Sequence, residues 1–325
     1  MEKKQLSAFK TMGRKPWFSS IIIFVLVFVG MSLLAPDTFL TTKNITNVLR
    51  QGAVYAIMAV GMSYAIMIGG IDLSQGSVLA VVAVTVAMIM KEGEGSVMLA
   101  VLAGLGIGAA IGLLNGVLIG YLDVPAFIAT LGTMYGTRGM ALILTNAAPI
   151  GANYEPFRVL GTGYFLGIPI PVYLVAAVAI VGQFILTKTA TGRYILAVGS
   201  NAEASRLSGI NVRKTKVIAH VFCGVAVAIA AIMYVSRLGA AQPTAGDGYE
   251  LEAVCATVIG GTSILGGEGS IVGSAIGAII VMILRNGMVL LGVSTYWQQL
   301  IIGLVLVIAV ILDIFRKKAD ARKNS

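Results

Sequence analysis

Residues 199–216 read GSNAEASRLSGINVRKTK, a polar and basic stretch with long apolar runs on both sides. Apolar runs of about 20 residues can cross a bilayer as helices, whereas this stretch cannot. It therefore divides a series of candidate membrane spans. The side of the membrane on which it lies sets the orientation of every span before and after it.

The composition places the whole chain in the membrane class. Of its 325 residues, 58% are hydrophobic and 11% are charged, whereas soluble domains carry about 25% charged residues. Runs such as residues 21–29 and 300–312 are uniformly apolar, while a membrane β-barrel needs strands of alternating polarity. The sequence therefore predicts an all-α polytopic membrane protein.

The hydropathy pattern divides the chain into about ten predicted spans, with eight as the alternative count. The predicted spans cover residues 17–35, 46–68, 77–90, 96–119, 125–145, 171–187, 217–236, 251–264, 270–291 and 297–314. Two of them are short and lie beside glycine-rich loops, which is compatible with re-entrant helices. We expect a single transmembrane domain over residues 17–315, flanked by basic tails at 1–16 and 316–325.

The chain has a net charge of +9, and its lysines and arginines gather in the two tails and in a loop at residues 188–216. Cytoplasmic segments of membrane proteins collect these residues, so we expect both termini and the loop on the cytoplasmic side. An even number of spans agrees with this placement. Basic residues at the membrane surface also contact anionic lipid. Nucleic-acid binding would need a folded basic domain, and no segment offers one.

Glycine recurs at two kinds of position. Gly104, Gly108, Gly112, Gly116 and Gly120 are spaced by four, so they line one helix face and predict close helix packing. The segments IGGIDLSQGS (68–77) and IGGTSILGGEGS (259–270) resemble each other, and each joins two spans on the predicted inner side. They suggest an internal repeat, as transporters often have.

Catalytic and metal-binding patterns are missing from the sequence. It contains no nucleotide phosphate loop, no nucleophile elbow and no cysteine or histidine pair at metal-ligand spacing. Ion-coupled transporters keep ionisable residues near mid-membrane, whereas Arg138 and Arg285 are the charged residues assigned here to spans. Each is interpreted as a snorkelling or helix-packing residue, with a substrate contact as the alternative. The sequence therefore predicts a non-catalytic protein and disfavours a secondary transporter.

The polar stretch contains the signals of a short helix. Asn201 is a candidate N-cap, Glu203 lies in the first turn, and Gly209 fits the C-terminal stop. A helix of about two turns is not stable alone in water, so it must dock onto another surface. A cytoplasmic partner chain is the natural candidate for that surface.

Glu203-Ala204-Ser205, followed after three residues by Gly209, resembles the E-A-A-x-x-x-G loop of ABC importer permeases. In those proteins the short helix sits in a cleft of the ATPase subunit. Ser205 stands here in place of the second alanine of the motif. The resemblance implies that the ATPase contacts come from this helix, through Glu203, Ala204, Ser205, Arg206, Leu207 and Gly209.

Longer segments place the resemblance in the ribose-type sugar importers, the branch that also holds galactose, xylose and autoinducer-2 permeases. These segments are AIMAVGMSYAIMIGGIDLSQGS (56–77), TATGRYILAVGSNAEASRLSGINV (189–212) and AQPTAGDGYELEAVCATVIGGTSILGGEGSIVG (241–273). The similarity runs from about residue 36 to the end. It implies a permease subunit of the bacterial inner membrane. Ribose is the expected substrate, and another sugar, autoinducer-2 or a nucleoside are the alternatives.

The resemblance also implies the partners. A second copy of the permease completes the pore, ATPase chains that hold ATP and magnesium dock on the cytoplasmic side, and an external sugar-binding protein delivers the substrate. This chain itself is expected to bind no cofactor. For the binding-protein contact we predict Arg50, Arg158 and Arg237, with Arg237 favoured, because they are the basic residues nearest the outer surface.

Thr130, Thr133 and Thr137 form a polar stripe on one predicted span and are candidates for the substrate path. The alternative is that their hydroxyls bond back to the carbonyls of their own helix.

Overall fold

The computed structural model describes residues 16–91 and 95–323, and helices make up most of them. The helices, in chain order, are α2 (Pro16–Leu34), α3 (Pro36–Phe39), α4 (Thr42–Met67), α5 (Gln75–Met90), α6 (Val97–Gly120), α7 (Ala126–Thr145), α8 (Glu155–Thr162), α9 (Ile170–Lys188), α10 (Ala190–Ser200), α11 (Ala202–Leu207), α12 (Val212–Leu238), α13 (Tyr249–Ile259), α14 (Ile271–Leu290) and α15 (Thr295–Lys323). The basic residues of the N-terminal tail lie outside the described part.

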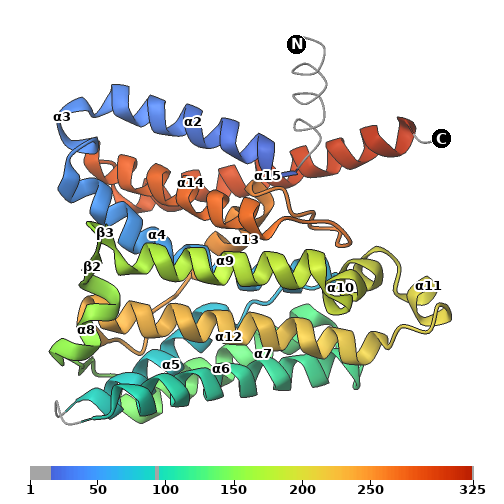
Figure 1. Ribbon diagram of the computed structural model, residues 1–325, viewed down its shortest axis with the longest axis horizontal. Coiled ribbons are helices and arrows are strands. Elements are labelled where there is room, and N and C mark those ends of the chain that lie inside the picture. The colour runs from blue at the N-terminus through green and yellow to red at the C-terminus, as the bar shows by residue number, and fades with distance from the viewer. Residues whose placement is uncertain (1–15, 92–94, 324–325) are drawn as a thin grey trace.

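The long helices run roughly along the long axis of the molecule (Figure 1). Helix α8 and two short strand pairs lie at one end. Strand β1 (Ile150–Gly151) pairs antiparallel with β4 (Ala240–Ala241), and β2 (Tyr164–Phe165) pairs with β3 (Ile168–Pro169). Helix α11 and the end of α15 lie at the opposite end. The two ends therefore carry different elements, as expected for the two sides of a membrane protein.

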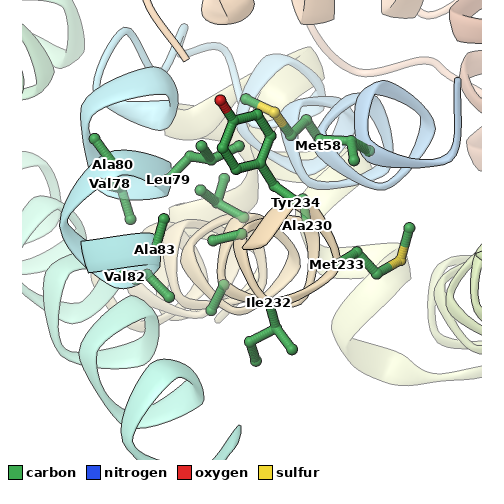
Figure 2. Packing of buried hydrophobic residues seen from close by; sticks show 14 of the residues in the cluster. Met58, Val78, Leu79, Ala80, Val82, Ala83, Ala230, Ile232, Met233 and Tyr234 are labelled. Carbon is green, nitrogen blue, oxygen red and sulfur yellow. The ribbon is translucent and has the colours of Figure 1, made fainter. Parts of the chain in front are cut away.

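Helix α4 forms the centre of the bundle. Its residues 52–67 are all buried, and the helix packs against α9, α12, α13 and α14. Met58 of α4, Leu79 of α5 and Tyr234 of α12 meet in the same apolar cluster (Figure 2). A helix that is apolar all round is a core helix. By contrast, α2 and α9 expose large apolar side chains, with Leu33 77% and Ile180 68% exposed, as helices in contact with lipid do.

The glycine stripe of α6 packs against α12, as predicted. A Cβ atom added at Gly108 would lie 2.4 Å from the carbonyl oxygen of Gly224, and one added at Gly112 would lie 2.4 Å from that of His220. Both distances are shorter than any real Cβ contact, so a larger residue would force the helices apart. The expectation of close helix packing on this face is confirmed.

The length and apolar composition of the helices fit a polytopic membrane protein. Within the described residues, five are long and apolar enough to cross a membrane: α6, α9, α12, α14 and the part of α15 over Thr295–Phe315. Helix α13, over Tyr249–Ile259, rises only about 16 Å, roughly half of a bilayer core. The loop at 260–270 then joins it to α14.

Candidate functional site

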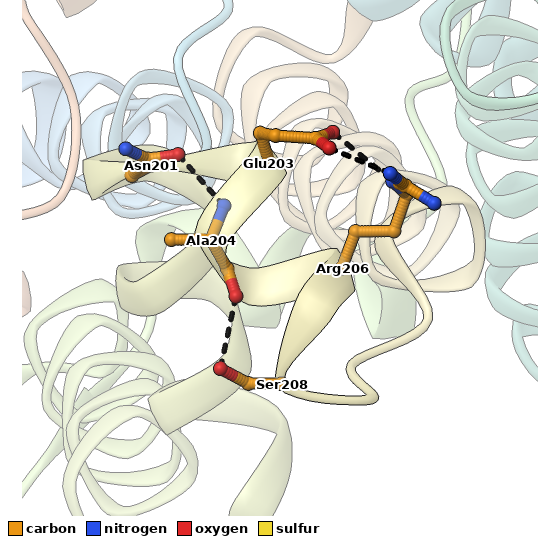
Figure 3. A network of polar contacts seen from close by, with 5 residues as sticks. All are labelled: Asn201, Glu203, Ala204, Arg206 and Ser208. Atoms are coloured by element: carbon orange, nitrogen blue, oxygen red, sulfur yellow. Dashed lines mark hydrogen bonds and ion pairs between the residues drawn. The ribbon is translucent and has the colours of Figure 1, made fainter.

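The loop at 188–216 folds as two helices, α10 and α11, joined at Asn201. The Asn201 side chain accepts a hydrogen bond of 2.9 Å from the backbone N–H of Ala204 (Figure 3). This bond satisfies one of the free donors at the start of α11. The predicted N-cap is confirmed.

Gly209 ends α11 in the left-handed conformation, with φ +83°. Its N–H donates to the carbonyl of Arg206, and the N–H of Ile210 donates to that of Ser205, both at 3.0 Å. This pair of bonds is the Schellman motif, which needs a residue that tolerates positive φ. The predicted stop at Gly209 is confirmed.

The free surface of α11 is a mixture of charge and one apolar side chain. Leu207 is 75% exposed. Glu203 and Arg206 form an exposed ion pair of 2.6 Å (Figure 3). The hydrogen bonds from Arg206 hold the pKa of the Glu203 carboxyl below its usual value. An exposed pair of this kind contributes little stability, so both side chains are free to meet a partner.

Ser205 differs from the other residues predicted to touch the ATPase. It is only 5% exposed, whereas Ala204 and Gly209 are exposed. Residues three and four apart share a helix face, and α11 turns the face that carries Ser205 toward its own chain. Ser205 therefore lies on the side of α11 that faces its own chain, and its contact with a partner stays a prediction.

Helix α10 was not predicted. Its N-cap is Thr189, whose hydroxyl accepts from the N–H of Gly192, and its buried side chains include Ile195 and Val198, three residues apart. The cap and this spacing are the signals that would have located the helix. It packs on α9, α4 and α12, so α11 is carried on a helix that belongs to the core.

Three segments meet at the end of α10, and we call their contact the glycine junction: residues 67–69, 199–200 and 266–267. The N–H of Gly267 donates to the carbonyl of Met67 at 2.9 Å. A Cβ atom added at Gly199 would lie 1.7 Å from that same oxygen, and one added at Gly267 would lie 2.3 Å from the Ser200 hydroxyl. The backbones are therefore in direct contact. The two similar glycine loops and the polar stretch, far apart in sequence, converge here.

The second glycine loop is also tied to the last helix. The Asp313 carboxylate on α15 accepts from the Ser263 hydroxyl at 3.0 Å and from the backbone N–H of Ile264 at 3.2 Å. The junction therefore connects α10 with α4, α14 and α15. A displacement of α10 would therefore act on both α4 and α15 through these contacts.

The three arginines predicted for binding-protein contact all lie next to α8, at the end opposite α11. Arg50 donates to the carbonyl of Thr162 at the end of α8, and its guanidinium lies 4.7 Å from the centre of the Tyr164 ring. Arg158, on α8, donates to Asn153 at 3.0 Å. Arg237 lies at the end of α12, beside α8: a Cβ atom added at Gly161 of α8 would lie 2.4 Å from the backbone nitrogen of Arg237.

The three arginines are all half-buried, and they differ in what they contact. Arg50 satisfies a carbonyl at the end of α8, and Arg237 lines a cavity between helices. Arg158 makes its hydrogen bond at an exposed position. The contact of these arginines with a binding protein stays a prediction for all three.

The threonine stripe is buried between α7 and its neighbours. Thr130 and Thr137 bond to carbonyls of their own helix at 2.8 Å. Thr133 donates to Asn115 of α6 at 2.6 Å, and Thr137 shares a bond of 2.7 Å with Ser77 of α5. Bonding to the own helix, the alternative named from the sequence, therefore holds for Thr130 and Thr137, while Thr133 and Thr137 also join α7 to α6 and α5.

The arginines assigned to spans are both paired. Arg138 donates to the carbonyls of Pro243 and Ala245 at 2.7 and 2.8 Å. Arg285 forms an ion pair with Glu252 and donates to the Tyr55 hydroxyl at 3.1 Å. Glu252 was not predicted as a charged residue within a span, because it stands at the edge of the predicted span 251–264. In the structure it is 8% exposed.

The apolar helices thus form a bundle that exposes the short capped helix α11 at one end (Figure 1). The chain belongs to the family described as the branched-chain amino acid transport system permease component, which matches residues 44–310. Over 306 residues it is 44% identical to the ribose import permease protein RbsC of Escherichia coli (strain K12), covering 92% of this chain and 95% of that protein.

Further relatives are similar over the same length. The ribose import permease protein RbsC of Bacillus subtilis (strain 168) is 45% identical over 300 residues, 91% of each chain. The D-allose transport system permease protein AlsC of Escherichia coli (strain K12) is 34% identical over 296 residues, again 91% of each chain. No solved structure matches the chain significantly.

Proposed function

We propose that this chain is the permease subunit of an ATP-driven, binding-protein-dependent importer of ribose in the bacterial inner membrane. The observation that carries the proposal is the exposed α11, with its Glu203-Ala204-Ser205 motif and Gly209 cap, in a chain 44–45% identical to ribose import permease proteins. The allose permease is less similar, at 34% identity, which favours ribose. The chain itself performs no covalent chemistry and binds no cofactor in this proposal.

The proposed mechanism follows the contacts. An ATPase chain, which holds ATP and magnesium, binds the exposed surface of α11 and moves it when its own dimer closes. Helix α10 passes the movement to the glycine junction, and from there to α4 and α14. Packed interfaces switch between discrete arrangements, so a small shift at the junction can reorient these helices. A second copy of the permease completes the pore in the membrane.

The proposal is tested by reconstitution. The permease, its ATPase and its binding protein in liposomes should accumulate labelled ribose when ATP is supplied on the ATPase side, and unlabelled ribose should compete better than allose or xylose. Uptake without ATP would instead support the ion-coupled alternative. Uptake of another sugar would keep the importer and change its substrate.

We also propose about ten spans with both termini in the cytoplasm. Cysteine at Ala202, on α11, should resist a membrane-impermeant thiol reagent in intact cells, whereas cysteine at Ala148, in the loop after α7, should react. Both positions are exposed, and the native Cys223 and Cys255 are buried, so background labelling should be low. Labelling of Ala202→Cys from outside would contradict the orientation.

The outer contact is proposed to centre on Arg158. Arg158→Glu should reduce stimulation of the ATPase by the binding protein several-fold, and more at low salt, because carboxylates on the binding protein would then be repelled. Arg158→Lys keeps the charge and should retain most of the stimulation. Equal stimulation of the wild type and Arg158→Glu would remove Arg158 from this role.

A further inference from the structure

A polar cavity of about 230 Å³ lies between the core helices, near the end that carries α8. Its lining comes from α4, α12, α13 and α14: Gln51, Val54, Tyr55, Tyr234, Arg237, Tyr249 and Arg285. Two larger cavities, around Val27 and around Phe222, are lined almost entirely by aliphatic and aromatic carbon. The polar cavity is therefore chemically unlike its neighbours.

The lining combines aromatic surface with hydrogen-bonding groups. The rings of Tyr55 and Tyr249 lie 4.6 Å apart, centre to centre. The guanidinium of Arg285 is held in place by Glu252 and by the Tyr55 hydroxyl. Tyrosine offers an apolar face together with a polar end, which suits a ligand that has both C–H and O–H groups.

A polar group that lines this cavity lacks a partner. Among the described residues, Arg237 lines the cavity and its Nε is buried without a hydrogen bond. Buried donors and acceptors are normally satisfied, and leaving them unsatisfied costs stability. The Nε–H of Arg237 is a donor, so a molecule with hydroxyl groups can accept from it.

The size of the cavity also restricts the ligand. It is far larger than one water molecule needs, and it is below the range of roughly 300–1,000 Å³ that holds drug-sized ligands. A single monosaccharide fits this interval, and an oligosaccharide does not.

The cavity and the glycine junction share two helices. Gln51 and Tyr55 lie in the first half of α4, and Met67 ends it. Arg285 lies near the end of α14, whose start follows the junction. A movement at the junction therefore reaches two of the four helices that line the cavity, α4 and α14.

We propose that this cavity is a transient binding site for a monosaccharide on its way through the permease. The proposal rests on the proposed import function and places the sugar within one subunit, between its outer halves of α4, α12 and α14. Arg237 and Gln51 contact the hydroxyl groups of the sugar, and Tyr249 covers its carbon face.

Thiol protection tests occupancy directly. Gln51 is exposed, so Gln51→Cys in the full importer should react with an impermeant thiol reagent from the outer side. Saturating ribose, without binding protein, should slow that reaction at least threefold, while Ala148→Cys should react at the same rate with and without ribose. Protection by inorganic phosphate and not by ribose would overturn the proposal, as would the absence of any protection.

A filling variant tests passage. Gln51→Trp should reduce ribose uptake at least tenfold while the binding protein still stimulates the ATPase, because only the path is blocked. Ile180→Trp, on the exposed face of α9, is the matched control and should transport normally. Normal uptake by Gln51→Trp would refute the site. If the wild type itself failed to import ribose, the proposed substrate would be wrong, a result that is distinct from either outcome here.

Discussion

Replacing Gly209 by tryptophan should abolish ribose uptake and co-purification of the ATPase while the permease remains folded and inserted. Gly209 lies on the exposed side of α11, and no atom lies within 4 Å of a Cβ placed there. A side chain can therefore leave the backbone here without a clash at its Cβ, and an indole excludes a partner that must come close to the backbone. The measurements are ATPase pull-down with tagged permease and uptake of labelled ribose.

The backbone at this position requires a matched control. Gly209 has φ +83°, where a residue with a side chain costs about 1–2 kcal/mol. Asparagine tolerates this conformation better than most residues. Gly209→Asn should therefore retain most of the ATPase binding that Gly209→Trp loses. If the tryptophan variant held the ATPase and transported at wild-type levels, α11 would not be the docking element.

Replacing Gly199 by valine should separate ATPase binding from transport. The added Cβ would lie 1.7 Å from the carbonyl oxygen of Met67, so the glycine junction must open. Helix α11 itself is not touched. We expect ATPase pull-down near the wild-type level and ribose uptake reduced at least tenfold.

Gly106→Val is the control for the substitution itself, because nothing lies within 4 Å of a Cβ at Gly106. It should transport normally. Detergent-solubilised Gly199→Val should elute from a size-exclusion column as the wild type does, which reports that it is folded. Full uptake by folded Gly199→Val would show that the junction does not transmit the movement.

The local signals of the sequence predicted the local structure well. Asn201 marks the start of α11 and Gly209 marks its end. Both could be predicted because capping depends on a few neighbouring residues. The glycine spacing of α6 located its packing face for the same reason, since helical periodicity alone decides which residues share a face. Such features need no knowledge of distant segments.

Features that depend on distant segments could not be predicted. The glycine junction joins residues near 68, 199 and 267, and only the folded chain brings them together. Ser205 has the same small polar character as its exposed neighbours, so the packing of α11 on the chain, and not its residue type, covers it. The ion pair of Arg285 with Glu252 likewise links two helices whose contact no periodicity reveals.

Residues of the glycine junction and exposed residues of α11 should differ in how much substitution they tolerate. Its contacts are made by backbone atoms of Met67, Gly199 and Gly267, which no change of side chain can improve and most would disrupt. The exposed side chains of α11, in contrast, face away from their own chain, so in the proposed importer they can vary with the surface of the ATPase. In the proposed importer, a different ATPase can be accommodated by changing only the exposed residues within 202–208, with the covered Ser205 kept. Hybrid importers assembled from mismatched subunits should therefore be rescued by grafting that short segment, with the backbone contact behind it left unchanged.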